Sequence, residues 1–262
     1  MKAIHRAAMV GAACMAAASW TATAWAAGEA ASIPAYITAA VDNPARTATD
    51  RARDALRKPA EVIAFAGIKP GDRIGELMPG GGYFTAIFCR VVGPSGHVYA
   101  VSIMPAKTMP MPKPAAGKKM PPRPAPSPLC KNVTPSSVPI AAFTMPASLD
   151  VVWTSENYHD LHNTMFGKPD MVAFDKDIFS ALKPGGIFIV EDHVAEAGSG
   201  ARDTETLHRI DPELVKREVE AAGFKLVASS DLLHRTDDPH TQKVFALKGR
   251  TDKFLLKFQK PQ

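Results

Sequence analysis

The most informative absence in this sequence is that of a long apolar segment after residue 26. Without one, no membrane-spanning helix can form later in the chain, so we expect no stable membrane insertion. The net charge of +5 is not gathered on one predicted folded face, which argues against a nucleic-acid partner. Only 22% of the residues are charged and 46% are hydrophobic, which excludes a disordered composition and suffices for a domain core.

The first 26 residues have the features of a cleaved signal peptide. Lys2 and Arg6 give a positive start, and the Ala-rich apolar run that follows ends at Ala26 in an A-x-A cleavage pattern. We therefore predict a periplasmic or secreted protein that is cut after Ala26. A flexible leader is expected over 27–46 and a single domain over 47–262.

Two of the three cysteines, Cys89 and Cys130, belong to the predicted mature chain. The oxidising compartment outside the cytoplasm would allow a disulfide between them. The alternative is one buried thiol and one loop thiol. The sequence leaves both open, because pairing depends on the geometry of the fold.

Strand and helix patterns alternate through the predicted domain, which indicates a doubly wound α/β fold with a mostly parallel sheet and helices on both faces. The short connection between the last two strands predicts an antiparallel pair there. A Pro- and Lys-rich stretch without periodicity, at 104–129, is predicted to be a solvated insertion. Strands are expected at 73–77, 97–103, 131–138, 149–154, 187–190, 224–229, 243–247 and 254–258, and helices at 47–57, 59–66, 83–92, 169–182 and 212–222.

A glycine-rich turn stands at the end of the first of these strands. The strand contains Glu76, runs into Gly80, Gly81 and Gly82, and is followed at once by a helix. Backbone N–H groups, a helix N-terminus and a carboxylate then surround one crevice, where open α/β sheets bind nucleotide-like ligands. The pattern is not the dinucleotide-binding G-x-G-x-x-G, because Thr85 stands at the third glycine position.

On these residues the chain resembles the class I methyltransferases that use S-adenosylmethionine, over about residues 50–260. The resemblance implies a seven-stranded Rossmann-like sheet with an antiparallel last strand. It also implies that S-adenosylmethionine is the methyl donor.

Ser102 stands where such enzymes usually place an acid on the ribose, and Met78 stands where their glycine pattern begins. The resemblance rests on segments 76–82, 149–157 and 182–186, and runs at 50–54, 153–162 and 208–212 are similar to those of a group of predicted exported bacterial methyltransferases. The donor-binding residues that it implies are Glu76, Gly80, Gly81, Gly82, Ser102 and Asn157.

Polar side chains follow the fourth and fifth predicted strands, at 156–162 and 191–193. If the two strands are neighbours, these side chains approach the donor crevice from the same edge of the sheet. The unperturbed pKa of histidine suits a general base at neutral pH, so His159 or His193 is a candidate for that role. The candidate catalytic residues are His159, Asp160 and His193, and the candidate substrate-contacting residues are Tyr158, His162 and Asp192.

We therefore expect methyl transfer to a small acceptor, with two alternatives. The first is an exported binding protein that keeps the fold but has lost the donor, which Ser102 favours. The second is a metal-dependent hydrolase that uses the His/Asp cluster. No metal is predicted, because the spacing of His159 and His162 lacks a third ligand in the sequence. His208 and Asp211 are expected to be structural, with Asp211 as a helix cap.

Overall fold

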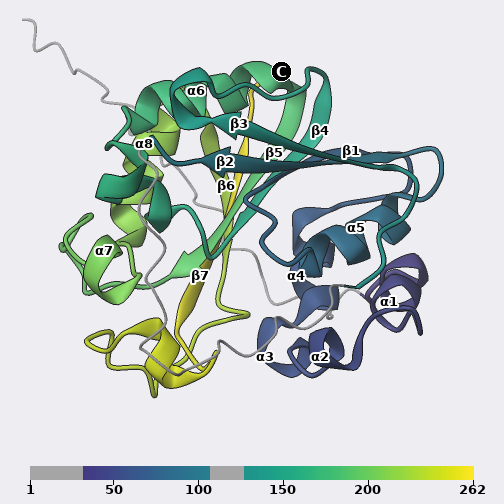
Figure 1. Cartoon of the computed structure of the whole chain (residues 1–262), viewed down its shortest axis with the longest axis horizontal. Helices are drawn as coiled ribbons and strands as arrows, with labels where there is room; N and C mark the ends of the chain where they lie inside the picture. The colour runs from purple at the N-terminus through teal and green to yellow at the C-terminus, as the bar shows by residue number, and fades with distance from the viewer. Residues whose placement is uncertain (1–31, 107–126) are drawn as a thin grey trace, which may run out of the picture. The chain divides into compact units, whose positions relative to one another are not determined.

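The computed structural model describes residues 32–106 and 127–262. Their strands form one sheet in the order β3-β2-β1-β4-β5-β7-β6 (Figure 1). Strand β7 is antiparallel to both of its neighbours, β5 and β6, and all other neighbouring strands are parallel. The predicted α/β fold with its reversed last strand is therefore confirmed. The strands are β1 (Arg73–Leu77), β2 (His97–Met104), β3 (Val133–Pro139), β4 (Leu149–Ser155), β5 (Leu182–His193), β6 (Lys225–Ser230) and β7 (Lys253–Gln259).

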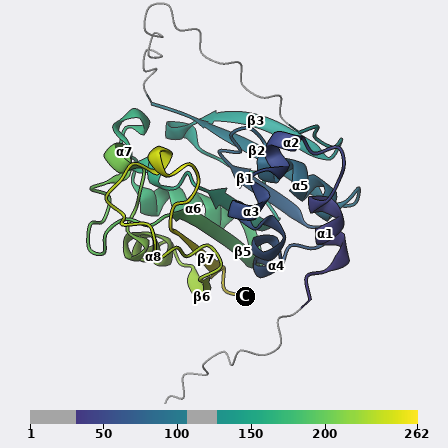
Figure 2. The same cartoon turned by 90° about the horizontal axis from the view of Figure 1, so that it is seen from below.

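Helices cover both faces of this sheet (Figures 1 and 2). One hydrophobic cluster joins the sheet to α6 and α8, and a second joins it to α1, α4 and α5. The α-helices are α1 (Ala35–Val41), α2 (Ala48–Arg51), α3 (Asp54–Arg57), α4 (Pro59–Ala66), α5 (Tyr83–Val92), α6 (Met171–Ala181), α7 (Thr204–Leu207) and α8 (Pro212–Ala221), and the 3₁₀ helices are η1 (Ile140–Ala142), η2 (His159–His162), η3 (Thr164–Phe166) and η4 (Val244–Leu247).

Local residue chemistry explains where the helices around the site begin. Helix α5 follows Gly82, whose φ of 77° lies in the left-handed region that glycine adopts freely. Helix α6 is capped by the Asp170 side chain, which accepts a hydrogen bond from the backbone N–H of Ala173. Asp211 caps α8 in the same way, as predicted, through the N–H of Glu213.

The chain order reverses direction across the sheet between β1 and β4. Strands β2 and β3 lie on the far side of β1, and β5 lies on the far side of β4. At such a switch point the loops after the two strands diverge and leave a crevice at their C-terminal ends. The segments that follow β1 and β4 therefore define the place where a ligand can enter.

Three predicted segments differ from the structure. The predicted helix over 47–57 is divided into α2 and α3, because Asp54 turns its carboxylate to Arg46 and Tyr83 instead of to its own helix. The predicted strand over 243–247 is instead the 3₁₀ helix η4, which begins at Val244. Strand β6 pairs directly with β7 and leaves no position between them. The leader over 27–46 was predicted to be flexible, but it contains α1, whose Ile37 is buried against α5.

Cys89 and Cys130 form a disulfide, which answers the question that the sequence left open. It ties α5 to the segment before β3, where the Asn132 amide also donates to the carbonyls of Cys89 and Gly93. The predicted signal peptide and residues 107–126 of the predicted insertion lie outside the described residues. Among the described helices, none combines the length and apolar character that a bilayer crossing requires.

Candidate functional site

A first cavity of about 200 Å³ lies at the switch point, between the segments that follow β1 and β4. Gly80 and Gly81 line it, and a Cβ added to either glycine would meet no atom within 4 Å. Gly82 does not line it, and an added Cβ there would meet Thr85 at 3.6 Å. The first cavity is lined by Arg53, Arg57, Glu76, Leu77, Met78, Pro79, Gly80, Gly81, Tyr83, Phe84, Trp153, Ser155, Glu156 and Asn157.

Met78 holds the backbone of this turn in an uncommon conformation. Its φ of 48° is in the left-handed region, which costs a residue with a side chain about 1 kcal/mol. The backbone N–H of Met78 donates to Val101 O, and its carbonyl accepts from the Asn157 amide at 3.0 Å. Asn157 thus ties the loop after β4 to the turn after β1 and lines the first cavity, as predicted.

Glu76 is a buried carboxyl group at the floor of the first cavity. The Thr85 hydroxyl donates to its Oε2 at 2.5 Å. Burial raises the pKa of Glu76 to about 7, although the Thr85 hydrogen bond and the Arg57 charge act in the opposite direction. Ser102, for which a donor contact was predicted, is exposed on β2 and does not line the first cavity.

A second cavity, of about 370 Å³, adjoins the first. The two share the side chains of Arg53, Arg57 and Glu156. The segment from η4 to the start of β7 supplies most of its remaining wall. The second cavity is lined by Arg53, Leu56, Arg57, Glu156, His193, Val244, Phe245, Lys248, Gly249, Thr251 and Lys253.

Glu156 stands at the boundary of the two cavities. Its carboxylate accepts hydrogen bonds from Arg57 and, at 2.8 Å, from Lys253, which also bonds Glu191 at 2.8 Å. Although burial opposes ionisation, Lys253 and Arg57 hold the pKa of Glu156 well below its usual range. The sequence assigned no role to Arg57 or Lys253, which lie 99 and 97 positions away from Glu156.

The two candidate general bases have different surroundings. Asp192 is buried and accepts from the backbone N–H of His159 and from its Nδ1, each at 2.8 Å. Burial would lower the pKa of His159, but Asp192 and Asp160 outweigh it and raise this pKa to about 10. His193 lines the second cavity, where Thr251 Oγ1 lies 2.8 Å from its Nδ1. Burial lowers the pKa of His193 to about 4, so its imidazole is uncharged at neutral pH.

Tyr158 and His162 were predicted to contact substrate, but the structure places both side chains away from the two cavities. Tyr158 is fully buried, with its hydroxyl 2.8 Å from Asp175 on α6 and 3.1 Å from Glu218 on α8. His162 Nε2 lies 3.2 Å from the same Glu218 carboxylate. Neither residue lines either cavity. Both residues contact carboxylates on α6 or α8 and so hold η2 against these helices. Asp192, which was also predicted to contact substrate, is fully buried and positions His159 instead of lining a cavity.

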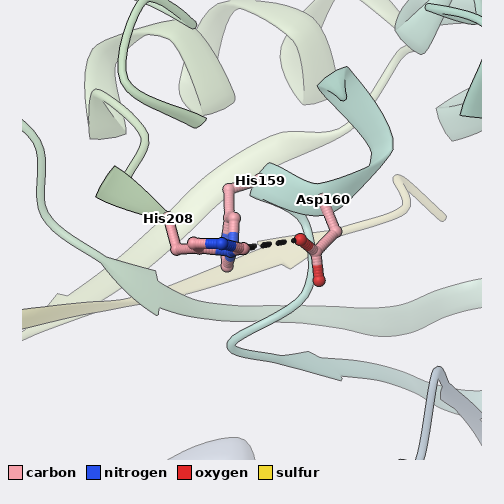
Figure 3. Close-up of side chains that lie close together, drawn as sticks. All are labelled: His159, Asp160 and His208. Carbon is pink, nitrogen blue, oxygen red and sulfur yellow. Dashed lines mark hydrogen bonds and ion pairs between the residues drawn. The ribbon is translucent and has the colours of Figure 1, made fainter. Parts of the chain in front are cut away.

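His159, Asp160 and His208 lie together beside the second cavity (Figure 3). His159 and Asp160 come from η2, and His208 follows α7. Their side chains point toward one another, and each offers a ligand atom within 4.8 Å of the others. These residues could hold a metal ion. His208 was predicted to be structural, and its proximity to His159 could not be read from positions 49 residues apart.

Comparison with known proteins bears on the fold. No protein-family model matches the chain, and no curated protein matches it. A SAM dependent methyltransferase from Aquifex aeolicus is 15% identical with a TM-score of 0.51, over 79% of this chain and 92% of that chain. A chain from the complex between the Haloferax volcanii Trm112 methyltransferase activator and its assigned methyltransferase is 14% identical with a TM-score of 0.50, over 87% and 98%. At these identities the likeness shows the fold, which is the Rossmann-like fold of such methyltransferases.

Proposed function

We propose that this protein transfers a methyl group from S-adenosylmethionine to a small acceptor. The observation that carries the proposal is the first cavity. It opens at the switch point of a methyltransferase-like sheet, beside two glycines that leave space for a ligand. A fold alone does not determine function, so the proposal depends on the chemistry of this cavity and its neighbour.

The residues of the first cavity suit the chemistry of the donor. S-adenosylmethionine supplies an electrophilic methyl group on a sulfonium, and it carries a carboxylate, an ammonium group and ribose hydroxyls. Arg53 is 45% exposed, and its ion pair with Asp50 is as long as 3.4 Å, so its guanidinium is available to a carboxylate. The buried Glu76 carboxyl can accept hydrogen bonds from hydroxyls or the ammonium group.

The second cavity supports the acceptor side of the proposal. It meets the first at Glu156, so an acceptor there would lie next to the donor, and positioning is the main contribution an enzyme makes to such a transfer. Of the two candidate bases, His193 lines this cavity and has an uncharged imidazole that can take a proton from a hydroxyl or amine. We therefore favour His193 over His159 as the general base.

Donor binding is the first test. Residues 27–262 contain a single tryptophan, Trp153, and it lines the first cavity. Titration of S-adenosylmethionine into the chain that begins at residue 27 should therefore change the fluorescence of Trp153. Calorimetry on the same sample should show one site.

A glycine substitution makes this test specific. Gly81→Leu places a side chain in open space, so the protein should stay folded while the donor binds at least tenfold more weakly. Ala173→Leu is the matched control, because Ala173 is exposed on α6 and lines neither cavity. Absence of heat at saturating donor, with folded protein, would contradict the proposal and favour the binding-protein alternative.

The acceptor and the base can be tested together. Incubation with donor labelled on its methyl group and a periplasmic small-molecule extract should label a product that can be isolated. His193→Gln should slow this labelling at least tenfold and leave donor affinity unchanged, because His193 does not line the first cavity. Equal labelling by the two proteins would exclude His193 as the base.

We also propose that the protein acts outside the cytoplasm. The A-x-A pattern before Ala27 supports export, and the Cys89–Cys130 disulfide is stable in an oxidising compartment. Fractionation of a bacterium that expresses the chain should recover it from the periplasm or medium. N-terminal sequencing should begin at Ala27, and a cytoplasmic protein that retains its first 26 residues would refute this localisation.

A further inference from the structure

We propose that His159, Asp160 and His208 form a binding site for a divalent transition-metal ion such as Zn²⁺. His159 Nε2 lies 3.3 Å from Asp160 Oδ1 and 3.3 Å from His208 Nδ1, and the third side of the triangle, between His208 Nδ1 and Asp160 Oδ1, is 3.6 Å. Two imidazole nitrogens and a carboxylate oxygen therefore converge on one point (Figure 3). This site goes beyond the proposed methyl transfer and does not depend on it.

The size of this triangle matches the coordination sphere of zinc. Zinc holds nitrogen and oxygen ligands at about 2.0–2.1 Å in a tetrahedral array, in which ligand atoms are about 3.3–3.4 Å apart. A point equidistant from the three atoms of this triangle lies roughly 2.0 Å from each, a normal zinc–ligand distance. A set of two histidines and one carboxylate leaves a coordination position open, which is typical of metal ions that bind a substrate or water.

A second layer of hydrogen bonds holds these ligands in place. Asp192 lies 2.8 Å from His159 Nδ1, so Nδ1 keeps its proton and Nε2 is the nitrogen that gives up its proton to bind an incoming metal ion. The Asn163 amide donates to Asp160 Oδ1 at 3.1 Å. Metal-binding histidines almost always donate their other N–H to a carboxylate, a backbone carbonyl or a water, and Asp192 is such a partner for His159.

Two side chains of the triangle are partly exposed, and one of them contacts the wall of the second cavity. The side chains of Asp160 and His208 are 26% and 29% exposed, whereas that of His159 is 3% exposed. The ring of Phe245, which lines the second cavity, packs edge-on against His208 at 4.7 Å between centroids. A metal ion held here would border the second cavity and could bind an oxygen, nitrogen or sulfur atom of a ligand there.

Zinc titration tests the site directly. Full-length protein treated with a chelator and then dialysed should bind one Zn²⁺ per chain in competition with a chromophoric chelator. Co²⁺ in place of Zn²⁺ should give the visible absorption of a four-coordinate site with nitrogen and oxygen ligands. Absence of stoichiometric Zn²⁺ binding to the folded protein would overturn the proposal.

Variants locate the ion. His208→Gln and Asp160→Asn change partly exposed side chains, so both should remain folded, and each should weaken Zn²⁺ binding by more than roughly 100-fold, since even loss of an outer partner costs 10–100-fold. His97→Gln is the matched control, because His97, at the start of β2, bonds Thr134 on β3 and belongs to no part of the triangle. Unchanged binding in both triangle variants would overturn the site.

The same samples separate this inference from the proposed function. Donor binding measured with chelator present should equal that of the metal-loaded protein, because none of the three residues lines the first cavity. Failure to bind donor would therefore leave a confirmed zinc site intact. A folded protein that binds the donor but takes up no stoichiometric Zn²⁺ would overturn the metal site alone.

Discussion

Replacement of Glu76 by glutamine should stabilise the protein at alkaline pH, although it removes the carboxyl group at the floor of the first cavity. Glu76 is 3% exposed on the interior strand β1, and the hydroxyl of Thr85 is its hydrogen-bond donor. The burial of a carboxylate without an ion-pair partner disfavours its charged form. Glutamine has a similar shape, keeps an acceptor for Thr85 and carries no charge.

The magnitude follows from the pKa of Glu76, which burial raises from an ordinary 4.5 to about 7 in the folded protein. Each pKa unit corresponds to 1.36 kcal/mol, so the difference between 4.5 and about 7 is equivalent to about 3 kcal/mol. Because the folded pKa is the higher one, the folded state binds more protons than the unfolded state between these values. The contribution of Glu76 to stability is therefore greatest below pH 4.5, falls as pH rises toward 7, and stays reduced above it.

Urea unfolding of both proteins from pH 4.5 to 8.5 measures this effect. The free energy of unfolding of Glu76→Gln minus that of the wild type should rise from near zero at pH 4.5 to about 3 kcal/mol at pH 8. Glu220→Gln, on the exposed face of α8, should change stability by less than about 0.5 kcal/mol. A Glu76→Gln difference that is flat with pH would refute the claim that a buried, unpaired carboxyl controls this titration.

Two further perturbations test the tertiary structure. Reduction of the Cys89–Cys130 disulfide, which closes a loop of 41 residues, should lower the free energy of unfolding by about 4 kcal/mol, as measured by urea unfolding with and without reductant. Arg209→Met should lower it by about 3–5 kcal/mol, because Arg209 and Asp238 form an ion pair in which both side chains are fully buried and Asp238 would be left unpaired. A restored melting temperature in Arg209→Met/Asp238→Leu would support that cause, and an unchanged melting temperature in Arg209→Met alone would contradict it.

Much of the sheet could be predicted because the residues at each strand end determine where that strand stops. The predicted strand over 73–77 and helix over 83–92 have the bounds of β1 and α5, since the glycines between them permit the turn that separates them. The edge strand β3 was predicted despite Pro135 and Pro139, which an edge position tolerates. The prediction of a strand over 243–247 was wrong, because a single 3₁₀ turn and a short strand have similar apolar content.

The candidate site was predicted less well, because its contacts join distant parts of the chain. Of the predicted donor-binding residues, Glu76, Gly80, Gly81 and Asn157 line the first cavity and Gly82 does not; all lie at or after the ends of the two strands at the switch point. No role was predicted for Lys253, which reaches Glu156 only through the antiparallel pairing of β7 with β5. Tyr158 was given a role that its position does not support. It is a polar residue after a strand, but it is buried and its hydroxyl donates to carboxylates on two helices.

The conformation and ion pairs of Glu156 indicate that the wall between the two cavities has a functional role. Its φ of 59° costs about 1 kcal/mol, and a buried ion network gives little net stability because desolvation offsets the attraction. Stability therefore does not account for a strained glutamate clamped by Arg57 and Lys253. The clamp does fix charged groups at the wall of the second cavity, where burial lowers the pKa of His193 and keeps its imidazole uncharged at neutral pH. Under the proposed function, a proton released by an acceptor in that cavity would meet a neutral nitrogen base within the same wall.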